Sequence, residues 1–159
     1  MKIISHRGNI SGADCENDPL GVLEALRRFE TEIDLWSIEG KLFLGHDFPQ
    51  YPIDEQFVFN EKLWIHCKNL EAVEVLSGCG TKAHYFFHDR DLMTLTSQNI
   101  PWCNYGVYVK GGITVEGPPH AHIKKDILGI CTDFPNEWLC SNEKGNIKRY
   151  TEEILEGVK

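Results

Sequence analysis

Short apolar runs with strand character alternate with helical patterns along most of this chain. Strands are expected over residues 2–6, 31–36, 63–68 and 83–87, and helical patterns follow the first and third of these runs. Such alternation is typical of α/β proteins, in which the strands of a mostly parallel sheet or barrel are joined by crossover helices. The pattern therefore restricts the chain to an α/β architecture.

Capping residues mark both expected helices. Asp18, followed by a proline in the first turn, begins a helix that reaches about Phe29. Asn69 caps a second helix that ends near Gly78. Between them, Glu39-Gly40 supplies the turn of a hairpin whose returning strand covers 41–44.

The second half of the chain carries weaker patterns. Strands are expected near residues 102–109, 113–115 and 128–132. Asp89 or Asp91 opens a short helix that reaches Leu95, and the stripe of apolar residues over 147–158 predicts a tail helix.

The length of 159 residues limits the kind of barrel. A full (β/α)8 barrel takes about 250 residues, and about 200 at the low end. Either the barrel is abbreviated or the sheet is open, and the stretch 111–122, rich in Gly and Pro, favours a loop in place of a helix. We expect one domain over residues 1–159, an abbreviated TIM-like (β/α) barrel with some crossover helices reduced to loops.

Composition excludes several classes of protein. A net charge of −8 and a pI near 5.3 argue against a general nucleic-acid binder, since the one basic cluster, Lys124-Lys125, is too short to follow a phosphate backbone. No apolar run reaches the roughly 20 residues of a membrane span, and the N-terminus lacks the pattern of a signal peptide. These features predict a cytoplasmic protein, in which the six cysteines are small buried apolar residues.

Two histidines, His6 and His46, bracket two carboxylates, Glu32 and Asp34. Imidazoles move protons on and off oxygen near neutral pH. Carboxylates at i and i+2 of a strand point to the same side and can bind a hard cation. This combination suits the cleavage of a phosphodiester.

Four motifs in order resemble the glycerophosphodiester phosphodiesterase family, with a broader kinship to phosphatidylinositol-phospholipase-C-like barrels. They are Ser-His-Arg-Gly at 5–8, Glu-Asn at 16–17, Glu-Ile-Asp-Leu at 32–35 and Leu-Gly-His-Asp at 44–47. Residues 128–135 resemble the last strand of that family.

The resemblance implies a metal-dependent phosphoric diester hydrolase acting on a small glycerophosphodiester-like substrate. His6 and His46 match the general acid/base pair, and Arg7 contacts the phosphate. Glu32 and Asp34 match two of three carboxylate ligands for a divalent ion, Mg²⁺ or Ca²⁺. In such relatives a neighbouring substrate hydroxyl can attack first and give a cyclic phosphate, so a lyase outcome stays open.

One position departs from the family pattern. Where the family has Glu-x-Lys on the third strand, this chain has His66 and Lys68, which share one face. His66 is a metal ligand that shifts the preference toward Mn²⁺ or Zn²⁺, or a phosphate contact, or a buried histidine in a site with weakened metal affinity. His88 or Asp89 is a candidate to compensate for the missing glutamate, and Asp89 is also a candidate helix cap.

A shortened barrel implies a shallow cleft that suits a small or exposed phosphodiester. The aromatic residues expected to line it are Tyr51, Trp102, Tyr105 and Tyr108. A rival interpretation is a non-catalytic protein of the same fold that binds a phosphate ester and a metal but has lost turnover. The sequence specifies neither the alcohol of the substrate nor the oligomeric state.

Overall fold

The computed structural model of the chain describes residues 1–13, 16–120, 123 and 126–141. The helix expected over 147–158 and the basic pair at 124–125 lie outside the described residues. Within them the strands form one ten-stranded sheet.

The strands are β1 (Lys2–Ser5), β2 (Glu30–Ile38), β3 (Lys41–Leu44), β4 (Tyr51–Ile53), β5 (Leu63–Cys67), β6 (His84–Phe86), β7 (Met93–Leu95), β8 (Pro101–Cys103), β9 (Ile113–Glu116) and β10 (Gly129–Thr132). The helices are η1 (His6–Gly8), α1 (Pro19–Ala25), η2 (Glu55–Phe59) and α2 (Leu70–Cys79), and residues 135–141 are also helical.

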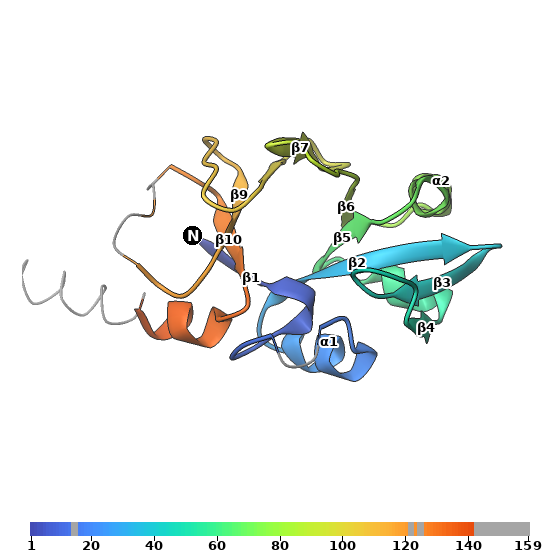
Figure 1. Cartoon of the computed structure of the whole chain (residues 1–159), viewed down its shortest axis with the longest axis horizontal. Coiled ribbons are helices and arrows are strands. Elements are labelled where there is room, and N and C mark those ends of the chain that lie inside the picture. Colours follow the sequence, from blue (N-terminus) through green and yellow to red (C-terminus); the bar gives the residue numbers. More distant parts are fainter. Residues whose placement is uncertain (14–15, 121–122, 124–125, 142–159) are drawn as a thin grey trace, which may run out of the picture.

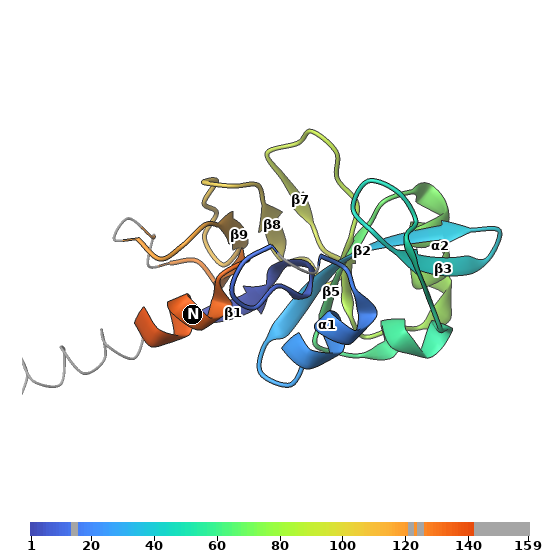
Figure 2. The same ribbon diagram turned by 60° about the horizontal axis from the view of Figure 1, so that its bottom comes forward.

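The centre of the sheet is parallel, in the order β6-β5-β2-β1-β10-β9-β8. The long strand β2 pairs with three strands. It pairs with β1 at Glu30 and Thr31, with β5 along its other edge, and with the antiparallel hairpin strand β3 from Leu35 onward. Antiparallel β4 and β7 extend the sheet beside β3 and β8. Figure 1 shows the strands curving in an arc, with β9 and β10 at one side and β3 and β4 at the other, and in the turned view of Figure 2 β9 and β3 again lie at opposite sides.

The expectation of a TIM-like (β/α) barrel was wrong. The sheet is mixed and forms a half-barrel, because no ladder joins β6 to β7 among the described residues. Separate hydrogen bonds that form no ladder link the two edges, among them those from Ser97 N to Tyr85 O at 2.7 Å, from Tyr85 N to Ser97 Oγ at 3.2 Å and from Thr94 Oγ1 to Phe87 O at 3.2 Å. The segments that connect the strands explain the difference. In a (β/α) barrel a helix follows each strand, whereas here β6 is followed by the antiparallel strand β7, and β8 is followed by a turn.

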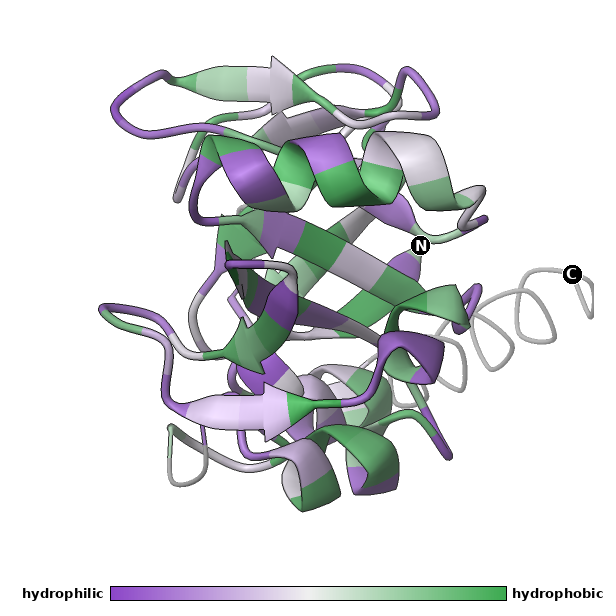
Figure 3. Ribbon diagram, turned by 90° about the vertical axis from the view of Figure 1, so that its right-hand side faces the viewer, coloured by the Kyte–Doolittle hydropathy of each residue, from purple (hydrophilic) through white to green (hydrophobic). Residues whose placement is uncertain are grey.

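Alternation along the strands gives the sheet two different faces. One face is covered by α1 and α2 and holds the larger apolar cluster, to which Ile33 and Leu35 of β2 contribute. The concave face holds a smaller cluster and the polar residues of β2 and β5. The smaller cluster consists of Ile4, Trp64, Phe86, Trp102, Ile113 and Cys131. Figure 3 shows apolar and polar residues alternating along the central strands, as a sheet with two such faces requires.

The two helix caps predicted in the first half of the chain are confirmed. Asp18 Oδ2 accepts a hydrogen bond from Gly21 N at 2.8 Å, and Asn69 Oδ1 accepts one from Ala72 N at 3.1 Å. The helix after Asp18 is shorter than expected and ends at Ala25.

The prediction of a short helix that reaches Leu95 was wrong. Met93–Leu95 forms β7 instead, because this segment pairs with Pro101–Cys103 of β8. The neighbouring strand expected over 102–109 is only three residues long.

Burial of the cysteines follows the expectation in part. Cys67, Cys103 and Cys131 are free and buried, whereas Cys140 is exposed. No described helix combines the length and the apolar character that a membrane crossing requires.

Candidate functional site

The site begins at the turn after β1. Arg7 has left-handed backbone angles (φ 53°, ψ 25°), which are uncommon for a residue with a Cβ, and Gly8 follows with φ 81°. This turn directs the Arg7 N–H at Glu32 Oε2, 3.1 Å away. The strained turn therefore holds His6 and Arg7 over the carboxylates of β2.

Asp34 lies under the site with its side chain 1% exposed. Oδ1 accepts a hydrogen bond from His66 Nδ1 at 3.0 Å and lies 3.2 Å from Lys68 Nζ, while Arg7 Nε forms an ion pair with Oδ2 at 3.0 Å. Burial disfavours ionisation of this carboxyl, but these three groups outweigh burial and hold the pKa of Asp34 well below its ordinary range. Asp34 is therefore a buried anion whose charge is compensated by protein cations.

Asn17 completes the surroundings of Asp34. Its side chain donates from Nδ2 to Asp34 Oδ2 at 2.9 Å and accepts from Asp34 N at 2.8 Å. The preceding Glu16 pairs with Arg7 at 2.9 Å. This Glu-Asn pair was counted among the family-like motifs of the sequence, but neither residue was assigned a role in the site.

Glu32 is in a different electrostatic position from Asp34. Burial and the charge of Asp34 raise the pKa of Glu32 above its ordinary value, and His6 and Arg7 offset only part of that rise. An additional cation beside Glu32 would favour its ionised form.

His66 on β5 faces two acceptors. Its Nδ1 lies 3.0 Å from Asp34 Oδ1 and its Nε2 lies 3.2 Å from His88 O, an arrangement that only the doubly protonated ring satisfies at both nitrogens. The ring of His88 packs against the ring of His66 with centroids 4.8 Å apart. Asp89 has no helix to cap, since the segment after it forms β7.

The three candidate metal ligands lie close enough to share one ion. Glu32, Asp34 and His66 each offer a ligand atom, and these atoms lie within 4.8 Å of one another. Such spacing suits a cation bound at roughly 2.0–2.4 Å from each ligand. Coordination by His66 would require the coordinating nitrogen to give up its hydrogen bond, to Asp34 Oδ1 if Nδ1 coordinates or to His88 O if Nε2 does, so the donor set fits a cation with one such rearrangement.

His6 is held by a partner that sequence reasoning missed. Asp133, directly after β10, lies 2.9 Å from His6 Nδ1 and also accepts from Asn9 Nδ2 at 2.8 Å. With Nδ1–H donating to Asp133, the other nitrogen, Nε2, points toward Glu32 Oε2 at 3.8 Å. Burial disfavours the charged ring, but the hydrogen bond to Asp133 and the charge of Glu32 outweigh it, so the pKa of His6 is raised.

His46 reaches the same site from the loop after β3. Gly45 has φ 150°, and a Cβ at this position would lie 2.2 Å from Phe48 O, so the tight turn that presents His46 requires glycine. Gly45 O also accepts from Trp36 Nε1 at 2.7 Å. The imidazole pairs through Nδ1 with Asp47 at 2.8 Å and is more exposed than His6.

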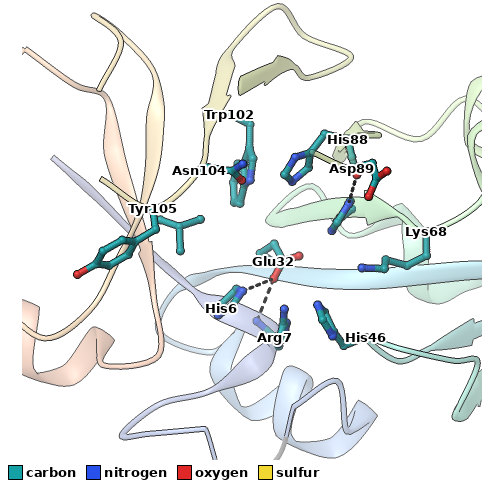
Figure 4. Close-up of a pocket in the computed structure, with 12 residues that line it drawn as sticks. His6, Arg7, Glu32, His46, Lys68, His88, Asp89, Trp102, Asn104 and Tyr105 are labelled. Carbon is teal, nitrogen blue, oxygen red and sulfur yellow. Dashed lines mark hydrogen bonds and ion pairs between the residues drawn. The ribbon is translucent and has the colours of Figure 1, made fainter. Parts of the chain in front are cut away.

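These side chains surround one cavity of about 570 Å³, shown in Figure 4. Its lining comprises His6, Arg7, Glu32, His46, His66, Lys68, His88, Asp89, Trp102, Asn104, Tyr105 and Val115. Every residue proposed from the sequence for catalysis, substrate or metal therefore lies in the lining, except Asp34, which lies directly beneath Arg7 and Lys68. Of the expected aromatic residues, Trp102 and Tyr105 line the cavity, and Tyr108 instead donates to Glu116.

Comparison of the chain with protein-family models, with curated proteins and with solved structures found no match. The resemblance to the glycerophosphodiester phosphodiesterase family stays a prediction from the motifs. The functional inference depends on the arrangement of the residues around the cavity.

Proposed function

We propose that this chain is a phosphoric diester hydrolase that cleaves a small, exposed phosphodiester in the cavity, with His6 and His46 as the acid/base pair. The observation that carries this proposal is the convergence of these two imidazoles, from separate loops, on a cavity that also contains Arg7 and Lys68. Each imidazole is hydrogen-bonded through Nδ1 to a carboxylate, which orients its Nε2 for proton transfer.

The cationic side chains of Arg7 and Lys68 form the proposed binding site for the phosphate. Arg7 offers a planar fork of donors, and Lys68 adds a point charge from the neighbouring strand. Both side chains are mostly buried, with exposures of 17% and 15%, so their charges are less screened than those of surface residues. One imidazole accepts a proton from the attacking water as the water oxygen bonds to phosphorus. The other donates a proton to the oxygen of the leaving alcohol as its P–O bond breaks.

A divalent cation at Glu32, Asp34 and His66 is part of the proposal. When bound, such an ion polarises a phosphoryl oxygen and stabilises the charge that develops on it. The raised pKa of Glu32 supports a cation there, since positive charge would relieve the repulsion between Glu32 and Asp34. Titration calorimetry with Mg²⁺, Ca²⁺, Mn²⁺ and Zn²⁺ tests it, and Glu32→Gln is expected to remove most of the heat of binding.

Turnover is tested with a panel of small glycerophosphodiesters followed by phosphorus NMR. We expect His6→Ala and His46→Ala to lower the rate roughly 10²- to 10⁴-fold, the range typical of general acid–base groups, without loss of the folded circular-dichroism spectrum. His84→Gln is the matched control, because His84 stacks on Trp64 and does not line the cavity. Full activity in either alanine variant contradicts the assignment, and accumulation of a cyclic phosphate identifies a lyase.

A second function has one observation in its favour. Asp34 already forms ion pairs with Lys68 and Arg7, as expected of a site that binds an anionic ester without needing a metal or turning it over. Tight binding of phosphate esters with no product under any divalent ion favours this non-catalytic protein.

A further inference from the structure

The cavity has two chemically different walls. One wall carries the ionisable groups His6, Arg7, Glu32, His46 and Lys68, and the lining also includes His66, His88 and Asp89. The other comes from the end of β8, the loop after it and β9, and consists of Trp102, Asn104, Tyr105 and Val115. Strand β8 is separated from β2 by β1, β10 and β9, so the curvature of the sheet places this neutral wall across from Lys68. Figure 4 shows Trp102 and Asn104 side by side and Tyr105 to their left, with His46 and Lys68 on the other side of the picture.

The neutral wall combines a fixed aromatic residue with an open one. Trp102 is 3% exposed and stacks on Phe86 with ring centroids 4.5 Å apart, so its position is set by the core. Tyr105 is 70% exposed although it lines the cavity, and its outer ring atoms lie beside Gly117. A large aromatic ring left open at the rim of a cavity offers a surface on which a flat group can stack.

Asn104 adds a polar contact between the two rings. Its Nδ2 donates to the backbone oxygen of Asp91, and its backbone N donates to Leu92 O at 3.0 Å. These bonds hold the carboxamide in place and leave Oδ1 to accept a hydrogen bond from a ligand. The wall therefore presents apolar aromatic surface together with one oriented acceptor.

We infer that the cavity selects phosphodiesters in which one alcohol carries a planar ring, which stacks on Tyr105 at the neutral wall. This inference rests on the proposed function, since the phosphate is placed at Arg7 and Lys68. A ring with a donor group at its edge, as in a nucleobase, satisfies Asn104 Oδ1 as well. Glycerol lacks a flat face and leaves the Tyr105 ring uncovered.

Matched synthetic diesters test the inference by calorimetry, independently of turnover. The probes are dimethyl phosphate, methyl 2-phenylethyl phosphate and methyl 2-cyclohexylethyl phosphate, which share the phosphate and differ in the planarity of the ring. We expect the phenyl diester to bind about twofold to twelvefold more tightly than the cyclohexyl diester, the range typical of aromatic pairing.

Substitutions assign that preference to one residue. In Tyr105→Ala the ratio of the two dissociation constants should fall to about one, whereas Tyr105→Phe should retain it, because the ring remains. Phe59→Ala is the control, since Phe59 is an exposed aromatic residue of η2 outside the cavity lining, and it should leave the ratio unchanged.

Equal affinity for the phenyl and cyclohexyl diesters, or a preference that survives in Tyr105→Ala, overturns the inference about the ring and leaves phosphate binding intact. No binding of any of the three probes overturns the proposed function and the inference with it. The two failures are therefore distinguishable in one set of titrations.

Discussion

Replacing Asp34 by Asn removes the negative charge at the centre of the site with little change in shape. Asp34 is the common partner of His66, Lys68 and Arg7, and its side chain is 1% exposed. The variant leaves the cations Lys68 and Arg7 facing one another without this buried counter-charge, and it changes the hydrogen-bond partner of His66. We expect the folded protein to lose stability for this reason, and not because of a cavity.

The size of the loss follows from the contacts that remain. Removing one partner of a buried ion pair costs about 3–5 kcal/mol. Arg7 keeps its ion pair with Glu16 at 2.9 Å, and Lys68 is 15% exposed, so water and other carboxylates compensate in part. The lower end of the range applies, about 3 kcal/mol, which corresponds to a fall in Tm of roughly 6–12 °C for a chain of this size.

Urea unfolding at pH 7 in the presence of a chelator measures the effect without a contribution from bound cations. Asp47→Asn is the matched control, because its carboxylate is 82% exposed and its replacement should change stability by less than about 0.5 kcal/mol. Adding Lys68→Met to Asp34→Asn should recover part of the loss, since it removes one uncompensated charge. A loss below about 1 kcal/mol in Asp34→Asn, or strictly additive losses in the double variant, would refute the reasoning.

Two further predictions concern the turn after β1 and the dependence of stability on pH. Gly8→Ala should cost about 2–4 kcal/mol, because Gly8 has φ 81° and a Cβ would lie 2.9 Å from Val22 Cγ2, whereas Gly40→Ala (φ 75°, no atom within 4 Å) should cost only about 1 kcal/mol. Equal losses of unfolding free energy in the two variants would contradict the steric argument. The pKa of Asp133 is lowered because its hydrogen bond with His6 outweighs burial, so its contribution to stability is present above about pH 4 and is lost as the pH falls further. The pKa of His6 is raised, so its contribution is complete below about pH 6.5 and is lost as the pH rises through the folded-state value. Asp133→Asn should reduce the dependence of the unfolding free energy on pH at both the acid and the alkaline end, as measured by urea unfolding across the pH range. If the variant shows the same pH dependence as the wild type, the pair of Asp133 and His6 contributes nothing to stability.

The local elements of the first half of the chain were predictable because short-range chemistry determines them. Asp18 and Asn69 bind backbone N–H groups at the beginnings of α1 and α2, and Glu39-Gly40 adopts positive φ angles (50° and 75°) in the hairpin turn. The second half was less predictable. Met93–Leu95 is a strand only because it has β8 as a partner, and pairing between segments that are not neighbours in the chain leaves a weak local signal.

Most of the candidate site could be named from the sequence, because its groups occur in runs with recognisable chemistry, such as Glu32 and Asp34 on one face of a strand. Two residues were missed for a physical reason. Asn17 and Asp133 act on groups that are distant in sequence: Asn17 binds Asp34, and Asp133 orients His6 from the opposite end of the described chain. An Asn or Asp in a loop is common, and only its partner distinguishes it from a capping or solvated residue.

The sequence by itself determined the order of the elements, the caps of the helices and the types of acid, base and cation available. The tertiary structure decided that the sheet stays open as a half-barrel, because that depends on whether β6 and β7 meet in a ladder, and neither strand encodes this alone. It also decided which charges are compensated. Glu32 and Asp34 are alike in sequence and differ in pKa direction, since electrostatic energy depends on the distance to every neighbouring charge and on burial, which only the assembled fold supplies.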